Sequence, residues 1–375
     1  MDLLKIRDQL DRIDREIVRL FEERMELVND VAEFKITTGK QVFDKEREQA
    51  KIAAVRKQAR GEFNQQAAEE IFTQLMTISR RFQYRLLEQH GQKADLGFKQ
   101  IDRIPVADAR VVYQGVEGAY SHEATLAYFG DKADCFHVKT WEDAMESVER
   151  GMADYAVIPI ENSSAGTVSP NYDLLIRHDN VIVAEVCLPV NHMLLGLPGA
   201  SLENIRSVYS HPQALMQCGE YLNARPQWRQ FSVENTAVAA RKIIEDQDKS
   251  QAAVASQAAG KLYGLEALAA GINHNKENTT RFIILTKDRV YQKDAQKVSL
   301  CFELPHKSGS LYNMLGNLIY NGVNMRMIES RPILGRNWEY RFFVDVEGNL
   351  SEPSIQNAIK AMSEEAANLR ILGNY

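Results

Sequence analysis

A cationic side chain interrupts an apolar repeat near the N-terminus. Apolar residues recur every three or four positions through residues 3–36, which indicates one face of a long helix. Arg24 takes one of these positions, between Leu20 and Leu27. A guanidinium there needs an anion, because burial without a partner is costly. Its partner is either a carboxylate of a neighbouring helix, as at register-setting positions of coiled coils, or an anionic ligand. The repeat comprises Ile6, Leu10, Ile13, Ile17, Leu20, Arg24, Leu27, Val31 and Phe34.

Other polar residues fall on the same predicted interior. Arg7 and Lys35 each follow a residue of the repeat, and Ser79 and Gln83 interrupt a stripe formed by Phe72, Met76 and Leu86. A helical bundle that served only structure would carry aliphatic residues at these positions. The spacing therefore favours a polar cavity inside the bundle, although an interhelical salt bridge at Arg24 explains the repeat equally well.

These side chains are placed by three predicted helices. The first covers residues 3–36 and ends at the break Thr37–Lys40; Asp44 is positioned to cap a second helix through about Lys57. A third amphipathic segment follows over about 64–90. Residues 1–90 thus form an all-helical unit.

This unit resembles the all-helical chorismate mutase domain over its whole length. The resemblance implies that chorismate is rearranged to prephenate, a step that requires no nucleophile or cofactor and depends on orientation and charge stabilisation. It implies that Arg7, Arg24, Arg47 and Ser79 bind the two substrate carboxylates, that Asp44 and Glu48 contact the ring hydroxyl, and that Lys35 and Gln83 address the ether oxygen.

The two arginines at the ends of this set are far apart on one helix. Arg7 precedes Arg24 by 17 residues, roughly 25 Å at about 1.5 Å per residue. One small dianion cannot bridge that distance. If both serve one site, Arg7 must come from a partner chain, which predicts an intertwined homodimer.

The middle of the chain alternates strands and helices. Residues 91–109 are polar, contain Gly and Pro, and are predicted to be a linker. Beyond it, the pattern is typical of α/β layers. Strands are predicted at 110–114, 155–160, 181–188, 206–210, 252–255 and 281–286, and helices near 121–129, 140–150, 212–223 and 236–246.

Small polar residues cluster where four of these strands meet a loop. The clusters are Gly115–His122, Ile158–Thr167, Ser210–Gln213 and Asn278–Phe282. Each could form only a turn or a helix cap, but strand ends are where α/β sheets bind ligands. The first cluster is not GxGxxG, which argues against a dinucleotide site.

Residues 110–286 resemble prephenate dehydratase, with Glu161-Asn162-Ser163 and Thr280-Arg281-Phe282 as the most specific motifs. The resemblance implies two α/β subdomains, like those of periplasmic binding proteins, and conversion of prephenate to phenylpyruvate. We expect Thr280 to polarise the leaving hydroxyl. Arg281 either anchors a carboxylate or braces Glu161. His122 could donate a proton, or could merely cap a helix or pack at a subdomain edge. The other substrate-binding candidates are Glu161, Asn162, Ser163, Ser210, His211 (also a possible proton donor or helix cap) and Gln217.

The last segment, 297–375, has a predicted βαββαβ order, typical of a ferredoxin-like α+β unit. It resembles the ACT regulatory domain, which implies feedback inhibition by phenylalanine. Ser310 replaces the usual alanine of the family's first motif. A dimerising unit with an ordinary helix cap is the alternative. The motifs that border the implied phenylalanine pocket are Ser308, Gly309, Ser310 and Leu311, and Glu329, Ser330, Arg331 and Pro332.

The composition limits the classes of partner that the protein is expected to bind. A formal net charge of −6 and a pI near 5.9 argue against nucleic acid. The four cysteines lack zinc spacing, and neither a signal peptide nor a membrane span is evident. We expect a cytoplasmic, bifunctional enzyme without metal or cofactor, forming a homodimer or a dimer of dimers. A non-catalytic sensor, or a nicotinamide-dependent enzyme fused to a mutase, is the alternative.

Overall fold

The computed structural model describes residues 2–90 and 95–375, which fall into two compact units. Unit 1 combines Met1–Leu96 with Leu300–Ile371, and unit 2 combines Gly97–Ser299 with Leu372–Tyr375. The first four residues of the predicted linker, 91–94, lie outside the described part of the chain. Within the described residues, no helix is both long enough and apolar enough to cross a membrane.

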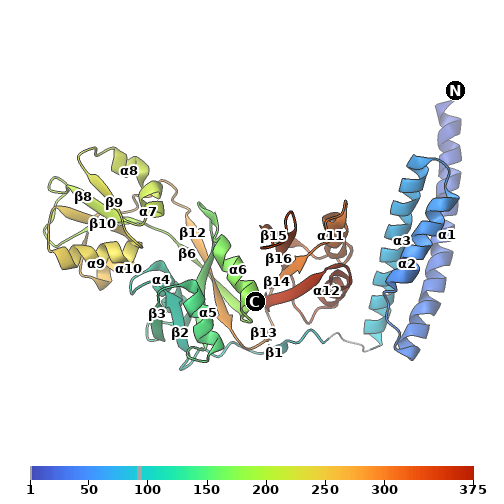
Figure 1. Cartoon of the computed structure of the whole chain (residues 1–375), viewed down its shortest axis with the longest axis horizontal. Coiled ribbons are helices and arrows are strands. Elements are labelled where there is room, and N and C mark those ends of the chain that lie inside the picture. The colour runs from blue at the N-terminus through green and yellow to red at the C-terminus, as the bar shows by residue number, and fades with distance from the viewer. Residues whose placement is uncertain (1, 91–94) are drawn as a thin grey trace. The chain divides into compact units, whose positions relative to one another are not determined.

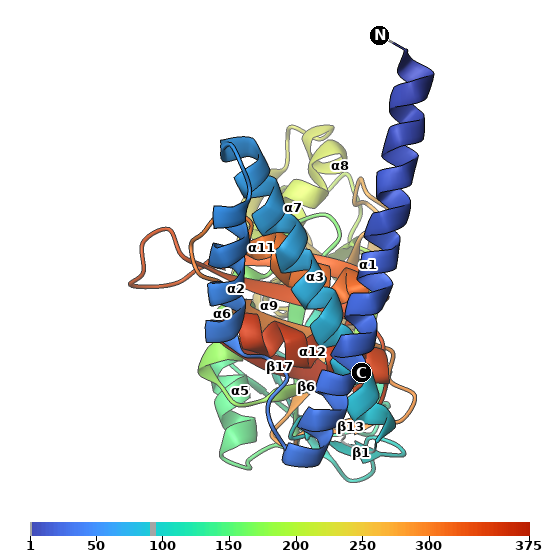
Figure 2. The same cartoon turned by 90° about the vertical axis from the view of Figure 1, so that its right-hand side faces the viewer.

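Three helices form the N-terminal part of unit 1 (Figure 2). They are α1 (Leu3–Thr38), α2 (Lys45–Gln58) and α3 (Glu62–Gln89), and α3 contacts both of the others. Gly39 ends α1 in the left-handed conformation, with φ 69°, which a glycine adopts without strain. The Asp44 carboxylate accepts a hydrogen bond from the Arg47 backbone N–H and so caps α2. The three predicted helices and the Asp44 cap are confirmed.

The apolar repeat of α1 is exposed in the single chain. Ile6 is 37% exposed, and Leu10, Ile13, Ile17 and Leu20 are 50–58% exposed. Burial on α1 is confined to Val28 and Ala32, in its C-terminal half. The N-terminal half of α1 therefore presents a long apolar stripe to solvent, which a monomeric soluble protein rarely does.

The C-terminal segment, of which Leu300–Ile371 belongs to unit 1, has the predicted βαββαβ element order. The strands lie side by side in the order β15, β16, β14, β17, and α11 begins directly after Gly309, whose φ is 78°. The elements are β14 (Lys297–Glu303), α11 (Ser310–Tyr320), β15 (Met325–Pro332), β16 (Tyr340–Glu347), α12 (Pro353–Glu365) and β17 (Asn368–Asn374).

Unit 2 contains two larger sets of paired strands, as expected for a protein with two α/β subdomains, and a small two-stranded sheet (Figure 1). In the first subdomain the strand order is β6, β12, β4, β2, β3, with β5 beside β4; in the second it is β11, β7, β10, β8, β9. The first has β2 (Arg110–Gln114), α4 (Tyr120–Phe129), β3 (Asp134–Val138), α5 (Trp141–Glu149), β4 (Tyr155–Asn162), β5 (Gly166–Thr167), α6 (Ser169–Arg177), β6 (Val181–Pro189) and β12 (Thr279–Thr286). The second has β7 (Met193–Gly196), β8 (Ser207–Ser210), α7 (Pro212–Gln217), α8 (Gly219–Asn223), β9 (Arg229–Ser232), α9 (Thr236–Asp246), β10 (Gln251–Ala255), α10 (Gln257–Leu262) and β11 (Glu266–Ala269).

Several local features differ from the sequence-based expectation, because β3, β5, β7, β9, β11, α6 and α10 match no predicted element. Within the predicted linker, β1 (Lys99–Ile101) pairs in parallel with β13 (Val290–Gln292). The helix predicted over 212–223 is divided into α7 and α8 at Cys218, whose N–H is shared between the Ala214 and Leu215 carbonyls. Such shared bonds are common where a helix tightens at its end, and Gly219 follows, a poor helix former.

Candidate active sites

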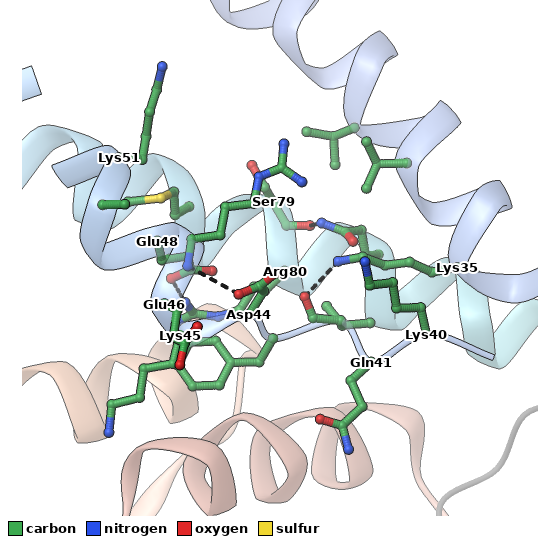
Figure 3. A pocket seen from close by; sticks show the side chains of 18 of the residues that line it. Lys35, Lys40, Gln41, Asp44, Lys45, Glu46, Glu48, Lys51, Ser79 and Arg80 are labelled. Carbon is green, nitrogen blue, oxygen red and sulfur yellow. Dashed lines mark hydrogen bonds and ion pairs between the residues drawn. The ribbon is translucent and has the colours of Figure 1, made fainter. Parts of the chain in front are cut away.

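A cavity of about 1280 Å³ opens between α1, α2 and α3, the N-terminal helices of unit 1. Polar residues from all three helices line it, and Lys35 on α1 and Glu48 on α2 lie on opposite sides (Figure 3). Seven of the eight residues predicted for the helical site line this cavity, whereas Arg7 does not. The seven are Arg24, Lys35, Asp44, Arg47, Glu48, Ser79 and Gln83.

Arg24 is half-buried and bonded to neutral groups. Its Nη1 donates to the Ser79 hydroxyl and, at 3.3 Å, to the Leu75 carbonyl. Burial lowers the pKa of Arg24, and the negative charge of Glu48 opposes this shift. Because both hydrogen-bond acceptors are uncharged, these bonds orient the guanidinium without neutralising it.

Lys35 carries a second cation to the same cavity. Its Nζ donates to the Val42 carbonyl at 2.7 Å. Burial is the main cause that lowers the pKa of Lys35; the Arg47 charge acts in the same direction, and Asp44 and Glu48 act against it. The proximity of several cations and burial both make an anionic ligand favourable here.

Gln83 presents an unusual buried amide to the cavity. One amide N–H donates to the Ser79 carbonyl at 3.2 Å, and Oε1 is buried with no hydrogen-bond partner among the described residues. A buried amide oxygen without a hydrogen-bond partner destabilises a protein interior, so such atoms are rare. The amide retains a second N–H, so Gln83 has both a donor and an acceptor for a ligand.

The carboxylates of the cavity have different surroundings. Asp44 is exposed and caps α2, whereas Glu48 forms an ion pair with Arg80 of α3. Arg80 was not predicted as a site residue. The signal was present, because Arg80 lies four residues after Met76 and three before Gln83, on the same face of one helix.

Thr280 and Asn162 meet on adjacent strands in unit 2. They are directly paired between β12 and β4, and the Asn162 Nδ2 donates to the Thr280 hydroxyl at 2.8 Å and to the Asn278 Oδ1 at 2.9 Å. The backbone N–H groups of Ser164 and Ala165 donate to the Asn162 Oδ1. This network holds the Thr280 hydroxyl in a defined orientation.

Ser163 joins the same strand end. Its backbone N–H donates to the Thr279 carbonyl, and its hydroxyl accepts from the Thr279 N–H, both at 2.9 Å. The two most specific motifs of the sequence therefore meet in the folded chain. Asn278, whose amide oxygen accepts a hydrogen bond from Asn162, belongs to the cluster Asn278–Phe282 but was not predicted as a site residue.

Arg281 is braced by protein groups. Its Nε donates to Glu185 and its Nη2 donates to the Tyr375 hydroxyl, both at 2.7 Å, and its Nη1 lies 3.6 Å from Glu161. Burial tends to raise the pKa of Glu185, but hydrogen bonds from Lys297 and Arg281 outweigh it and lower that pKa. These contacts favour the bracing role over the carboxylate anchor, which stays a prediction.

A polar chain joins residues of the two subdomains. Tyr120, which begins α4, hydrogen-bonds the His192 Nδ1 at 3.1 Å, and the His192 Nε2 lies 3.0 Å from the Gln217 Oε1. Since the Gln217 oxygen can only accept, Nε2 carries the proton and Nδ1 accepts from Tyr120. Gln217 is thus oriented by His192, which sequence reasoning missed, and its amide nitrogen is available as a donor.

The other predicted residues of unit 2 have structural partners. Ser210 is buried and donates to the Val254 carbonyl at 2.6 Å. His211 caps α7, and the His122 Nδ1 accepts from the Gly118 N–H at 3.1 Å. Burial lowers the pKa of both histidines. The capping interpretation agrees with the contacts of His211, whereas His122 lies inside α4, which has no side-chain cap.

The motifs predicted to border a phenylalanine pocket lie at one helix start and one strand end. Ser308 and Gly309 are exposed, and Ser310 and Leu311 open α11; Glu329–Pro332 ends β15. The helical cavity is lined by none of them. Among the described residues, no group of three His, Cys, Asp or Glu side chains could hold a metal ion.

The fold and the two polar sites define a protein of two enzymatic parts. Residues 6–84 match the model of "Chorismate mutase type II", and residues 111–290 match that of "Prephenate dehydratase". A protein of Enterobacter agglomerans described as "Bifunctional chorismate mutase/prephenate dehydratase" is 33% identical over 379 residues, covering 100% of this chain and 95% of that protein. The chain belongs to the family of bifunctional chorismate mutase/prephenate dehydratases.

Solved structures resemble a large part of the chain. A prephenate dehydratase from Arthrobacter aurescens in complex with L-Phe has a TM-score of 0.66 at 27% identity, covering 71% of this chain and 89% of that one. A protein described as "GqqA- a novel type of quorum quenching acylases" has the same TM-score at 32% identity, covering 71% of this chain and 97% of that one.

Proposed function

We propose that the helical cavity of unit 1 rearranges chorismate to prephenate and that unit 2 converts prephenate to phenylpyruvate. The observation that carries the first assignment is a cavity between three helices that contains two half-buried cations and an unsatisfied amide, Arg24, Lys35 and Gln83. Family membership supports both reactions.

In the helical cavity, the substrate carboxylates are bound by Arg24, Arg47 and Ser79. The carboxylates supply the anion that the uncompensated cations require, and their fixed positions favour the compact conformer that rearranges. Negative charge that develops on the breaking C–O bond is stabilised by Lys35 and by an amide N–H of Gln83. The ring hydroxyl is oriented by Asp44 and Glu48. No proton transfer is required.

Arg7 completes this site from a second copy of the chain. Its absence from the cavity lining and the exposed apolar stripe of α1 support an intertwined homodimer, because pairing two such stripes would bury them. Two such dimers could associate further into a dimer of dimers without altering the pairing of the stripes. The cytoplasmic location stays an expectation from composition.

In unit 2, Thr280 polarises the leaving hydroxyl of prephenate. The Asn162 amide donates to the Thr280 oxygen, so the Thr280 proton is directed to another acceptor, which the departing hydroxyl provides. Gln217, held by His192, and Ser163 supply further hydrogen bonds, and loss of CO₂ and hydroxide yields the aromatic ring of phenylpyruvate.

Residues 297–375 act as an ACT-type sensor of phenylalanine. The βαββαβ order and the complex of L-Phe with the Arthrobacter aurescens dehydratase support this assignment. Inhibition requires that phenylalanine bind one state of the protein better than another, and prephenate must then weaken phenylalanine binding by the same factor.

Purified protein fed with chorismate, without cofactors, tests both activities. We expect prephenate to appear first and phenylpyruvate to follow, more slowly when phenylalanine is added. Stable chorismate in the presence of folded protein would refute the mutase assignment. Calorimetry that detected no phenylalanine binding to the intact chain would remove the sensor assignment alone.

A further inference from the structure

Arg80 is the most buried cation of the mutase cavity, and the proposed mechanism does not use it. Its side chain is 9% exposed, compared with 20% for its partner Glu48. The guanidinium carbon also lies 4.8 Å from the centre of the Phe43 ring. Arg80 therefore occupies a fixed place in the wall of the cavity (Figure 3).

All described hydrogen bonds of the Arg80 guanidinium are directed at protein groups. Nη1 donates to the Glu48 Oε2, and Nη2 donates to the Thr77 hydroxyl at 3.2 Å and to the Glu365 Oε1 at 3.1 Å. With both terminal nitrogens engaged, this guanidinium is not arranged as a fork for a substrate carboxylate. It is arranged to hold carboxylates of the protein.

The consequence falls on Glu48. Its Oε2 accepts from Arg80, so Oε1 is left as an acceptor for a ligand hydroxyl. An ionised carboxylate with one oxygen fixed by a planar guanidinium has a defined orientation. The negative charge of Glu48 already acts to raise the pKa of Arg24. Without Arg80, the Glu48 side chain could turn toward Arg24 and neutralise the cation that should bind the substrate carboxylate.

We propose that Arg80 is a positioning residue of the mutase site, which keeps Glu48 directed at the substrate hydroxyl and away from Arg24. This inference rests on the proposed mutase function of the helical cavity. It adds a buried ion pair between α3 and α2 to the machinery that binds chorismate.

The chain contains a matched control. Arg56 on α2 and Glu69 on α3 form another ion pair between the same two helices, at 2.8 Å, but their side chains are 49% and 41% exposed and neither lines the cavity. Exposed pairs of this kind contribute little to stability. Arg56→Met therefore removes a cross-helix ion pair without altering the site.

The test is a double-mutant cycle on mutase activity in the full-length protein, with Arg80→Met, Glu48→Gln and the double variant. We expect Arg80→Met to lower kcat/KM about 10- to 100-fold, as loss of substrate positioning does. In the Glu48→Gln variant, the same replacement of Arg80 should lower kcat/KM by less than about twofold. Arg80→Lys should retain part of the activity, and Arg56→Met should match the parent. Dehydratase activity of each variant reports that unit 2 is folded, and circular dichroism reports the helices.

Two results would overturn the proposal. The first is a kcat/KM of Arg80→Met within about twofold of the parent value. The second is that Arg80→Met lowers kcat/KM by the same factor in the parent and in the Glu48→Gln variant. If Arg80→Met loses its helical signal, Arg80→Lys takes its place in the cycle. A parent protein without mutase activity would instead refute the proposed function, so the two failures are distinguishable.

Discussion

Arg24 of α1 donates a hydrogen bond to the hydroxyl of Ser79 on α3, so the cation of the apolar repeat meets a polar residue across the cavity. The contact separates the two explanations of a charged residue in this repeat. A register-setting arginine would be satisfied by a carboxylate, whereas Arg24 is oriented by neutral oxygens, as a binding site for an anion requires.

Arg24→Met should therefore impair function without impairing stability. We expect mutase kcat/KM to fall about 10- to 100-fold, since hydrogen bonds to charged groups contribute about 1.5–3 kcal/mol. The thermal midpoint should stay the same or rise, because a desolvated charge is removed. Arg19→Met is the control, since Arg19 is exposed on the same helix and pairs with Glu16 and Glu23. A large loss of stability with unchanged kcat/KM would favour the structural role.

Mixing two inactive variants tests the shared site. Arg7→Ala and Arg24→Ala proteins are each expected to lack mutase activity, but chains refolded together should recover roughly a quarter of the parent activity. Half of the dimers are then mixed, and each mixed dimer has one intact site of two. Activity measured against the mixing ratio, with size-exclusion chromatography of each sample, provides the answer. Absence of recovery in confirmed mixed dimers would contradict a site built from two chains.

Thr280→Val should slow the dehydratase step while chorismate is still rearranged. Valine preserves the shape of threonine but removes the hydroxyl that accepts from Asn162, and we expect kcat on prephenate to fall about 100-fold or more. Thr286→Val, at the other end of β12, should retain the parent rate. Phenylpyruvate formation from prephenate is the measurement, and an unchanged rate in Thr280→Val would refute the assignment.

The buried His192 should make unit 2 less stable in mild acid. Burial lowers its pKa in the folded chain, while an unfolded histidine has a pKa of about 6.5. Below that pH the unfolded chain binds a proton that the folded chain does not, so stability is complete above about pH 6.5 and is lost as the pH falls. The thermal midpoint of His192→Asn should depend less on pH between about 7.5 and 5.5. An undiminished pH dependence would contradict the buried neutral imidazole.

The elements that the sequence predicted well are those with strong local signals. The three helices follow from a long apolar period and from the caps at Gly39 and Asp44, and β2 and α9 were placed within their observed bounds. Strand β1 was missed because its pairing with β13 joins segments far apart in the chain and leaves no period in three residues.

The site residues also divide into those that a local pattern reveals and those whose roles depend on distant partners. Arg24, Ser79 and Gln83 could be identified because a polar residue in an apolar stripe is visible locally. The roles of Arg80 and Arg281 depend on partners from other elements, Glu48 for one and Glu185 with Tyr375 for the other. The helical spacing places Arg80 on the cavity face, but no local pattern identifies the partners of either arginine, so these pairings are found only in the structure.

The most direct test of the helical site is a crystal structure of the full-length protein with a stable bicyclic dicarboxylate that mimics the transition state of the rearrangement. Such a mimic should bind more tightly than the substrate. We predict its density between α1, α2 and α3, with carboxylates at Arg24 and the ether oxygen near Lys35 and Gln83. Density for the mimic elsewhere, with the cavity cations paired to carboxylates of the protein, would contradict the assignment.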